Sequence, residues 1–216
     1  MNNTLLFLRH GKTGPKRDPE NQEKILGISE WELTEEGRRQ SKEAAQIPEL
    51  QDVDVIVVST EEKAWQTAQP LIERLKEAGK RFTVVRSEKI AELNRDAGGY
   101  LAVGPYEEAA KEALTHRDVA IKTEHGEWET AAHALERFTT GVGIVDAEYS
   151  NKKILFIGHG YTIGMYFAQQ EKTLDKERLY ERVHDVPLCG WGMVREGKVL
   201  RSIFPEMKER LGERLV

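Results

Sequence analysis

Two short apolar runs, far apart in the sequence, end in the same way. Residues 5–11 read Leu-Leu-Phe-Leu-Arg-His-Gly, and residues 154–160 read Ile-Leu-Phe-Ile-Gly-His-Gly. An uninterrupted apolar run that closes abruptly in this way is typical of a buried parallel strand at the point where it leaves its sheet. Ligands of open α/β sheets bind beyond the carboxyl ends of such strands. We therefore expect His10 and His159 to meet in one crevice, which we interpret as the functional centre.

The remaining pattern alternates strands with helices, which predicts an α/β fold. Further strands are expected at residues 53–59 and 81–86, and a β-hairpin with a Glu196-Gly197 turn at residues 189–204. Helical periodicity or local helix signals mark several other stretches, at about residues 34–46, 61–78, 107–114, 127–140 and 161–170. Thr34 and Thr60 are the expected N-caps of the first two of these helices.

Length, charge and cysteine usage narrow the class of protein. A chain of 216 residues without an internal repeat or linker is expected to form one compact domain. The net charge of -5 argues against a general nucleic-acid partner. No apolar run approaches the roughly 20 residues that span a bilayer, and none resembles a signal peptide, so we expect no membrane partner and a cytoplasmic location. The single cysteine, Cys189, is expected to be a buried thiol within a strand.

Basic residues lie on both sides of the first histidine. Arg9 precedes His10, and the glycine- and proline-rich stretch at residues 11–30 predicts an irregular loop that carries Lys16 and Arg17. Such a loop either covers an anion near His10 or is simply solvated, and both interpretations suit the sequence equally well.

Lys63 lies in the first turn of a predicted helix, where the helix dipole disfavours a cation. It either assists the helix N-terminus in binding an anion or is a surface lysine neutralised by Glu61 and Glu62. Residues 100–126 show the weakest pattern, and we expect a cover over the crevice within residues 95–126.

Histidines and cations around one crevice suit a phosphoryl group, because arginine holds two of its oxygens in a fork and lysine adds a point charge. A neutral imidazole can attack phosphorus, and the charge of Arg9 favours the neutral form of His10. Glu92, just after the third strand, is the candidate proton donor. The sequence lacks a His-Glu-x-x-His motif, a cysteine pair and a P-loop, so no metal or other cofactor is expected.

Four motifs follow one another along the chain: Leu-Arg-His-Gly at 8–11, Leu-Thr-Glu-Glu-Gly-Arg-Arg-Gln at 33–40, Ser-Thr-Glu-Glu-Lys-Ala-Trp-Gln-Thr-Ala at 59–68, and Gly-His-Gly at 158–160. In combination they resemble the motifs of the histidine phosphatase superfamily, the phosphoglycerate mutase-like proteins. The resemblance implies a single-domain, three-layer α/β/α sandwich on a mostly parallel sheet. It also implies that His10 is the phosphorylated nucleophile, that Arg9 and His159 bind the phosphoryl group, and that Glu92 is the proton donor.

The sequence departs from this family in two places. Lys63 stands where the family usually has an arginine and loses the bidentate geometry, whereas Lys16 stands where many members have an asparagine and adds positive charge at the mouth. The segment around Glu92 also lacks the Leu-Asn-Glu-Arg-His-Tyr-Gly string of a glycerate mutase.

We therefore favour a metal-independent phosphomonoesterase acting on a small phosphorylated metabolite. A mutase, or a non-catalytic module that binds phosphorylated ligands, is the alternative. The sequence does not identify the substrate, and it is compatible with a homodimer. Five residues lie where a cover would contact the substrate, and core packing or surface exposure accounts for each of them equally well: Arg95, Tyr100, His125, Glu127 and Trp128.

Overall fold

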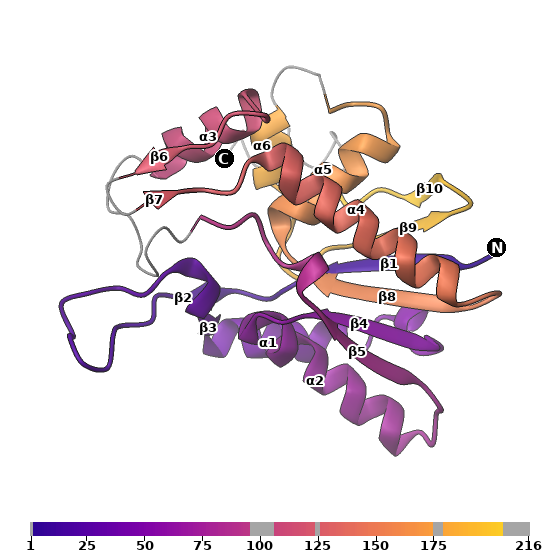
Figure 1. The fold of residues 1–216 in the computed structure, drawn as a ribbon. Helices are drawn as coiled ribbons and strands as arrows, with labels where there is room; N and C mark the ends of the chain where they lie inside the picture. Colours follow the sequence, from indigo (N-terminus) through magenta and orange to yellow (C-terminus); the bar gives the residue numbers. More distant parts are fainter. Residues whose placement is uncertain (1, 96–105, 124–125, 175–178, 205–216) are drawn as a thin grey trace, which may run out of the picture.

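The computed structural model describes residues 2–95, 106–123, 126–174 and 179–204. Its main sheet has six strands in the order β10-β9-β1-β8-β4-β5. Four of them are mutually parallel: β1 (Thr4–Arg9), β8 (Lys153–Gly158), β4 (Val55–Ser59) and β5 (Thr83–Ser87). The strands β9 (Trp191–Arg195) and β10 (Lys198–Arg201) add an antiparallel edge (Figure 1).

Helices cover both faces of this sheet. The helices α1 (Glu35–Ala44) and α2 (Glu62–Glu77) lie below it in Figure 1, and α4 (Ala131–Glu148) and α5 (Gly160–Gln170) lie above it. On the α5 side, α6 (Leu179–His184) contacts α5 and α3 (Tyr106–Thr115) contacts α6. The predicted three-layer α/β/α sandwich on a mostly parallel sheet is therefore confirmed.

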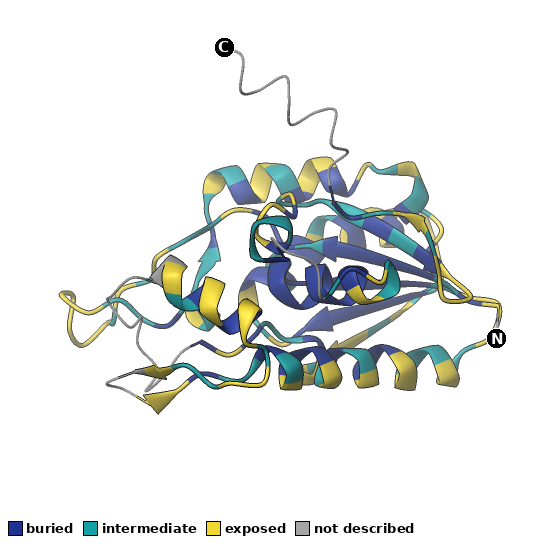
Figure 2. Ribbon diagram, turned by 90° about the horizontal axis from the view of Figure 1, so that it is seen from above, coloured by how far each residue is buried: buried dark blue, intermediate teal, exposed yellow. Residues whose placement is uncertain are grey.

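Side chains of the central strands alternate between two apolar layers. Leu6 and Leu8 pack toward α1 and α2, whereas Leu5 and Phe7 pack toward α4 and α5. All four are buried, as the dark-blue strands in Figure 2 show. Because both faces of these strands are covered, their sequences are apolar throughout instead of alternating with polar residues.

Short elements connect these layers. Two small ladders join β2 (Thr13–Gly14) to β3 (Glu32–Leu33) and β6 (Lys122–Thr123) to β7 (Gly126–Glu127). Three single-turn 3-10 helices complete the described elements: η1 (Ile28–Glu30), η2 (Pro48–Leu50) and η3 (Glu88–Ile90). None of the described helices is both long and apolar enough to cross a membrane.

Two glycines hold the chain after β1 against the start of α1. A Cβ atom at Gly37 would lie 2.1 Å from the carbonyl oxygen of Lys12, and one at Gly11 would lie 2.6 Å from the carbonyl oxygen of Gly37. Both obstacles are backbone atoms, so a side chain has no room at either position. This close backbone contact fixes the position of the segment that directly follows His10.

The N-cap residue predicted from the sequence is confirmed for α1 but not for α2. The Thr34 hydroxyl accepts a hydrogen bond from the backbone N–H of Gly37 at 3.1 Å, so the predicted cap of α1 is confirmed. The predicted cap of α2 at Thr60 is wrong. Glu61 is the N-cap residue because its own backbone remains extended, with φ -70° and ψ 137°. The helix α4 also begins later and ends later than the predicted stretch at 127–140.

The end of the chain contains the predicted hairpin. Glu196 and Gly197 have φ values of 50° and 70°, which is the left-handed geometry of a tight two-residue turn. Cys189 lies before β9 and not within a strand, because its φ of 53° breaks the extended backbone. Burial raises the pKa of this thiol to about 12.

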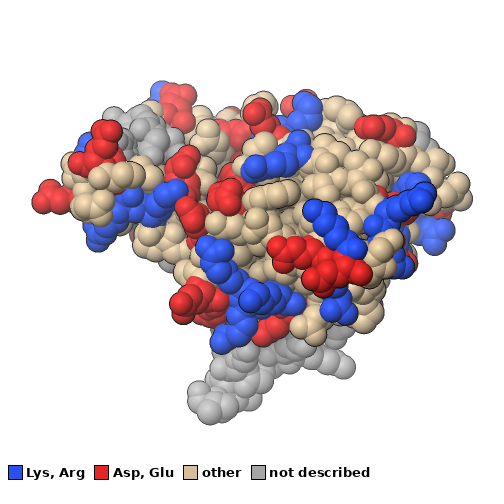
Figure 3. All heavy atoms as spheres, turned by 90° about the horizontal axis from the view of Figure 1, so that it is seen from below, with Lys and Arg blue, Asp and Glu red and all other residues tan. Residues whose placement is uncertain are grey.

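Charged side chains of both signs are intermingled on the face that carries α1 and α2 (Figure 3). Ion pairs also occur near the starts of β4 and β8, where Lys152 pairs with Asp54 at 2.9 Å and Lys153 pairs with Asp52 at 2.6 Å. Exposed pairs of this kind contribute little to stability, about 0–1 kcal/mol each.

Candidate active site

The two predicted histidines follow neighbouring parallel strands. The register pairs Arg9 of β1 with Gly158 of β8, so the next residue on each strand is His10 or His159. Their ring centroids lie 5.3 Å apart with the planes at 62°. His10 is 8% exposed and His159 is fully buried. The two imidazoles therefore meet at one edge of the sheet.

Hydrogen bonds assign a different tautomer to each ring. The Nδ1 atom of His10 lies 2.7 Å from the carbonyl oxygen of Gly11, which only accepts hydrogen bonds, so Nδ1 is the donor and Nε2 keeps its lone pair. The Nε2 atom of His159 lies 2.8 Å from the Ser59 hydroxyl and 3.3 Å from a carboxylate oxygen of Glu61. A carboxylate neighbour assigns the proton of His159 to Nε2.

Burial and neighbouring charge keep both rings neutral. Burial lowers the pKa of His10 well below its ordinary value, and His159, Arg9 and Lys63 lower it further. Burial also lowers the pKa of His159 to about 3, although the charge of Glu92 opposes this shift. Both imidazoles are therefore uncharged at neutral pH, and His10 presents an unprotonated Nε2.

These pKa shifts predict how stability depends on pH. Below the ordinary histidine pKa of 6.5, the two histidines are protonated in the unfolded chain but stay neutral in the folded protein. The free energy of unfolding is therefore highest above pH 6.5 and falls as the pH decreases toward 3. Between about pH 7.5 and 5, His159 is expected to contribute a loss of about 2 kcal/mol, and His10 changes the stability in the same direction.

Urea unfolding across this pH range measures the loss, because most carboxylates titrate below it. His159→Gln should flatten the dependence, whereas the exposed His116→Gln should leave it unchanged. An equal slope in the wild type and His159→Gln would contradict the prediction.

Arg9, at the end of β1, brings a cation beside His10. One of its guanidinium N–H groups donates to the carbonyl oxygen of Val186, and its buried Nε has no hydrogen-bond partner among the described residues. Gly160 packs directly on the guanidinium, because a Cβ atom there would lie 3.0 Å from both Cζ and Nε of Arg9. A buried donor without a partner next to a neutral imidazole suits an anionic ligand.

Lys63 is a buried cation and not a surface lysine. It is 1% exposed, and its ammonium forms an ion pair with Glu61 Oε2 at 2.8 Å and donates to the carbonyl oxygen of Ile28. The contact with Glu61 is an ion pair and not a well-aligned hydrogen bond. The interpretation of Lys63 as an ordinary solvated residue is therefore wrong.

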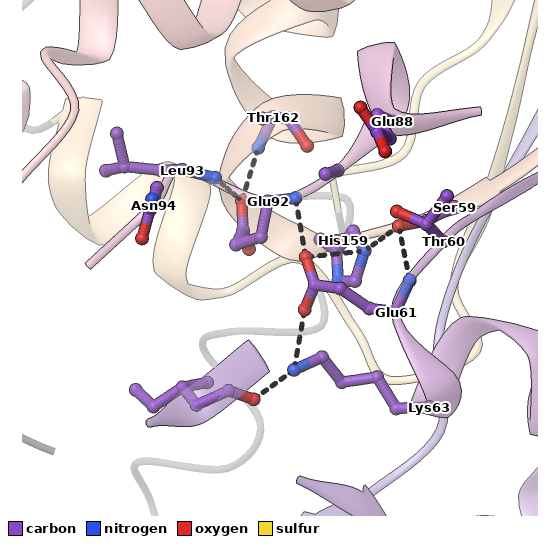
Figure 4. A network of polar contacts seen from close by, with 12 residues as sticks. Ser59, Thr60, Glu61, Lys63, Glu88, Glu92, Leu93, Asn94, His159 and Thr162 are labelled. Carbon is purple, nitrogen blue, oxygen red and sulfur yellow. Dashed lines mark hydrogen bonds and ion pairs between the residues drawn. The ribbon is translucent and has the colours of Figure 1, made fainter. Parts of the chain in front are cut away.

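Glu61 joins the site, which the sequence did not predict. Besides Lys63 and His159, its carboxylate accepts a hydrogen bond from the backbone N–H of Glu92 at 2.9 Å (Figure 4). The only signal in the sequence was its place two residues before Lys63, where we assigned it to simple charge neutralisation.

Glu92 lies at the start of α5, next to His159. Its Oε1 accepts from the backbone N–H groups of Leu93 at 2.9 Å and Thr162 at 3.1 Å, and its Oε2 accepts from Tyr161 at 3.1 Å. The carboxylate thus occupies the positive end of the helix dipole. This geometry brings Glu92 to the site, and its role as a proton donor stays a prediction.

A cavity of about 570 Å³ opens beside this cluster. Glu61 and Glu92 line it, as do three of the expected substrate contacts, Arg95, Glu127 and Trp128. The guanidinium carbon of Arg95 lies 4.6 Å from the centre of the Tyr161 ring. The other two expected contacts, at positions 100 and 125, and much of the expected cover lie outside the described residues.

The structure does not bring Lys16 into the cluster. Its ammonium forms an ion pair with Glu32 at 2.9 Å, and its side chain is 42% exposed. The β2–β3 ladder pairs Gly14 with Glu32 and so places this carboxylate beside the loop. A role for Lys16 in phosphate binding stays a prediction.

Comparison with known proteins identifies the family. A model of the histidine phosphatase superfamily (branch 1) matches residues 5–195, which include both His-Gly motifs. The chain belongs to this superfamily. This histidine phosphatase homologue is 28% identical over 159 residues to the uncharacterised phosphatase PhoE of Bacillus subtilis strain 168, a match that covers 74% of this chain and 72% of PhoE.

Solved structures share the fold. A mycobacterial glucosyl-3-phosphoglycerate phosphatase in complex with VO3 is 22% identical, with a TM-score of 0.60 over 88% of this chain and 90% of that one. A phosphoserine phosphatase mutant from Entamoeba histolytica, in complex with phosphoserine, is 20% identical, with a TM-score of 0.64 over 94% and 96% of the two chains. At these identities the likeness shows the fold alone.

Proposed function

We propose that this protein is a metal-independent phosphomonoesterase that acts on a small phosphorylated metabolite through a phosphohistidine at His10. The observation that carries the proposal is the pair of neutral imidazoles, 5.3 Å apart, next to the cations of Arg9 and Lys63. Among the similar proteins named above, two are phosphatases of small phosphorylated compounds, which supports this class of substrate.

The reaction has two steps. The Nε2 atom of His10 attacks phosphorus in line, so that a P–N bond forms while the P–O bond to the alcohol breaks. Water then attacks phosphorus, the P–N bond breaks and inorganic phosphate leaves. Arg9, Lys63 and Nε2–H of His159 stabilise the charge on the non-bridging oxygens, and these side chains supply the neutralisation that a metal ion provides elsewhere.

A proton donor completes the first step. We assign this role to Glu92, which in its protonated form gives a proton to the leaving alcohol and in its ionised form takes one from the attacking water. Lys16 is assigned a weaker role at the mouth of the site, because its ion pair with Glu32 engages its ammonium away from the imidazoles.

The test is a screen of phosphorylated metabolites and p-nitrophenyl phosphate in the presence of EDTA, with phosphate release as the readout. Hydrolysis should persist with EDTA, and an alkaline denaturing quench during turnover should trap phosphohistidine, which survives in base. Hydrolysis that stops with EDTA would contradict the metal-independent mechanism.

Two other results would favour the alternative functions. Turnover of 3-phosphoglycerate that depends on a bisphosphate primer would indicate a mutase. Phosphorylated ligands that raise the melting temperature without any phosphohistidine would indicate a binding module.

A further inference from the structure

The carboxylate of Glu61 occupies an anion site built from three elements. Lys63 of α2 contacts one oxygen at 2.8 Å. The backbone N–H of Glu92, after η3, donates to the other oxygen at 2.9 Å, and Nε2 of His159, before α5, lies 3.3 Å from it. Figure 4 shows these groups converging on Glu61 from separate parts of the chain.

The same groups are those that a phosphoryl ligand needs. The proposed function assigns Lys63 and His159 to the phosphoryl oxygens, and both already contact Glu61. Lys63 is 1% exposed and His159 is fully buried, so neither can turn away to meet a ligand elsewhere. A phosphoryl group that contacts both must therefore take the place of this carboxylate.

Electrostatic repulsion makes the Glu61 carboxylate and a phosphoryl dianion compete for this site. The charged side chains near the imidazoles are three cations, Arg9, Lys63 and Arg95, and two anions, Glu61 and Glu92, so the formal charge of the cluster is +1 while Glu61 is in place. A phosphoryl dianion that entered beside Glu61 would meet a like charge in a partly buried site. With Glu61 displaced, the formal charge of the cluster rises to +2, and the cluster attracts the dianion more strongly.

The Glu61 side chain borders open space into which it can move. Its side chain is 12% exposed and lines the cavity of about 570 Å³, which also reaches Glu88 and Glu129. No hydrogen bond from Lys63 holds Glu61 Oε2 in a well-aligned geometry. The carboxylate can therefore leave Lys63 and His159 by rotating toward the cavity.

We infer that Glu61 is a built-in competitor of the phosphoryl group, and that it sets the affinity of this site for phosphate and its monoesters. The inference rests on the proposed function, because it requires the site to bind a phosphoryl group. It names Glu61 as an affinity-determining residue with no part in the chemical steps.

The test compares Glu61→Gln with Glu62→Gln, using calorimetry with inorganic phosphate near neutral pH. The amide introduced by Glu61→Gln keeps an oxygen that can accept the hydrogen bond from the backbone N–H of Glu92, but it no longer competes as an anion. Glu62 is the matched control, since it is exposed, lies in the same turn of α2 and its replacement removes the same formal charge. We expect Glu61→Gln to bind phosphate at least about tenfold more tightly than the wild type, and Glu62→Gln to bind like the wild type.

Each outcome has a distinct meaning. Equal or weaker phosphate binding by folded Glu61→Gln would overturn the inference while the proposed function stands. If neither the wild type nor any folded variant binds phosphate, the proposed function fails and the inference fails with it.

A measurement on the wild type guards against a variant that does not fold. Phosphate should shift the ¹³C resonance of the Glu61 carboxylate, assigned by through-bond correlation to the Glu61 backbone in the wild type, as the carboxylate leaves Lys63. A resonance that stays in place at saturating phosphate would overturn the inference.

Discussion

Replacing His10 with alanine is expected to lower the hydrolysis of phosphate monoesters by about 10³-fold or more, because no other group in the cluster can take over as the nucleophile. Arg9 keeps its cation, Lys63 keeps its ion pair with Glu61, and His159 keeps its contacts with Ser59 and Glu61. The variant should therefore still bind inorganic phosphate while kcat collapses.

Steady-state assays and phosphate binding by calorimetry measure these two effects separately. The control is His116→Ala, which removes an exposed histidine after α3 and should leave kcat unchanged. If His10→Ala retained activity within a few-fold of the wild type, or still formed phosphohistidine, another residue would be the nucleophile.

Replacing Arg137 with alanine is expected to lower the free energy of unfolding by about 2–3 kcal/mol. The guanidinium of this α4 residue donates to four backbone carbonyl oxygens, those of Glu88, Lys89, Ala91 and Glu92. It also forms two hydrogen bonds with the Glu129 carboxylate, at 3.0 and 2.8 Å. Alanine would remove the Arg137 donor from every one of these acceptors, and Glu129 would keep its contacts with Asn94 and His133.

Activity should fall together with stability, because Arg137 holds the segment that carries Glu92. Its bond to the carbonyl of Glu92 is 3.0 Å long, so we treat Arg137 as a positioning residue. A displacement of about 1 Å at a catalytic group costs up to about 10²-fold in rate. We expect kcat to fall at least about tenfold and KM to change little.

The matched control is Arg74→Ala, which removes an exposed arginine that donates to one side chain, Gln51, at 2.8 Å. It should alter the free energy of unfolding by less than about 0.5 kcal/mol and leave kcat unchanged. Arg137→Lys keeps the charge but loses the fork of donors, so its stability and kcat should lie between those of the wild type and Arg137→Ala. Equal losses in Arg137→Ala and Arg74→Ala would contradict the positioning role.

Local signals predicted the framework well, because each depends on residues close together in the chain. The apolar runs that end at His10 and His159 became the two central parallel strands. Thr34 caps α1 through a contact three residues away, and the Glu196-Gly197 turn joins β9 to β10. Periodicity and turn chemistry of this kind are properties of short windows of sequence.

The sequence by itself therefore determined the α/β class, the sheet edge where two imidazoles meet and the family. Only the tertiary structure decided which partners the charged side chains take. It buried Lys63 against Ile28, paired Lys16 with Glu32, seated Glu92 on the start of α5 and placed Glu61 against Lys63 and His159. These choices depend on desolvation and on contacts between segments as far apart in the chain as those of Glu61 and His159, which no short window of sequence contains.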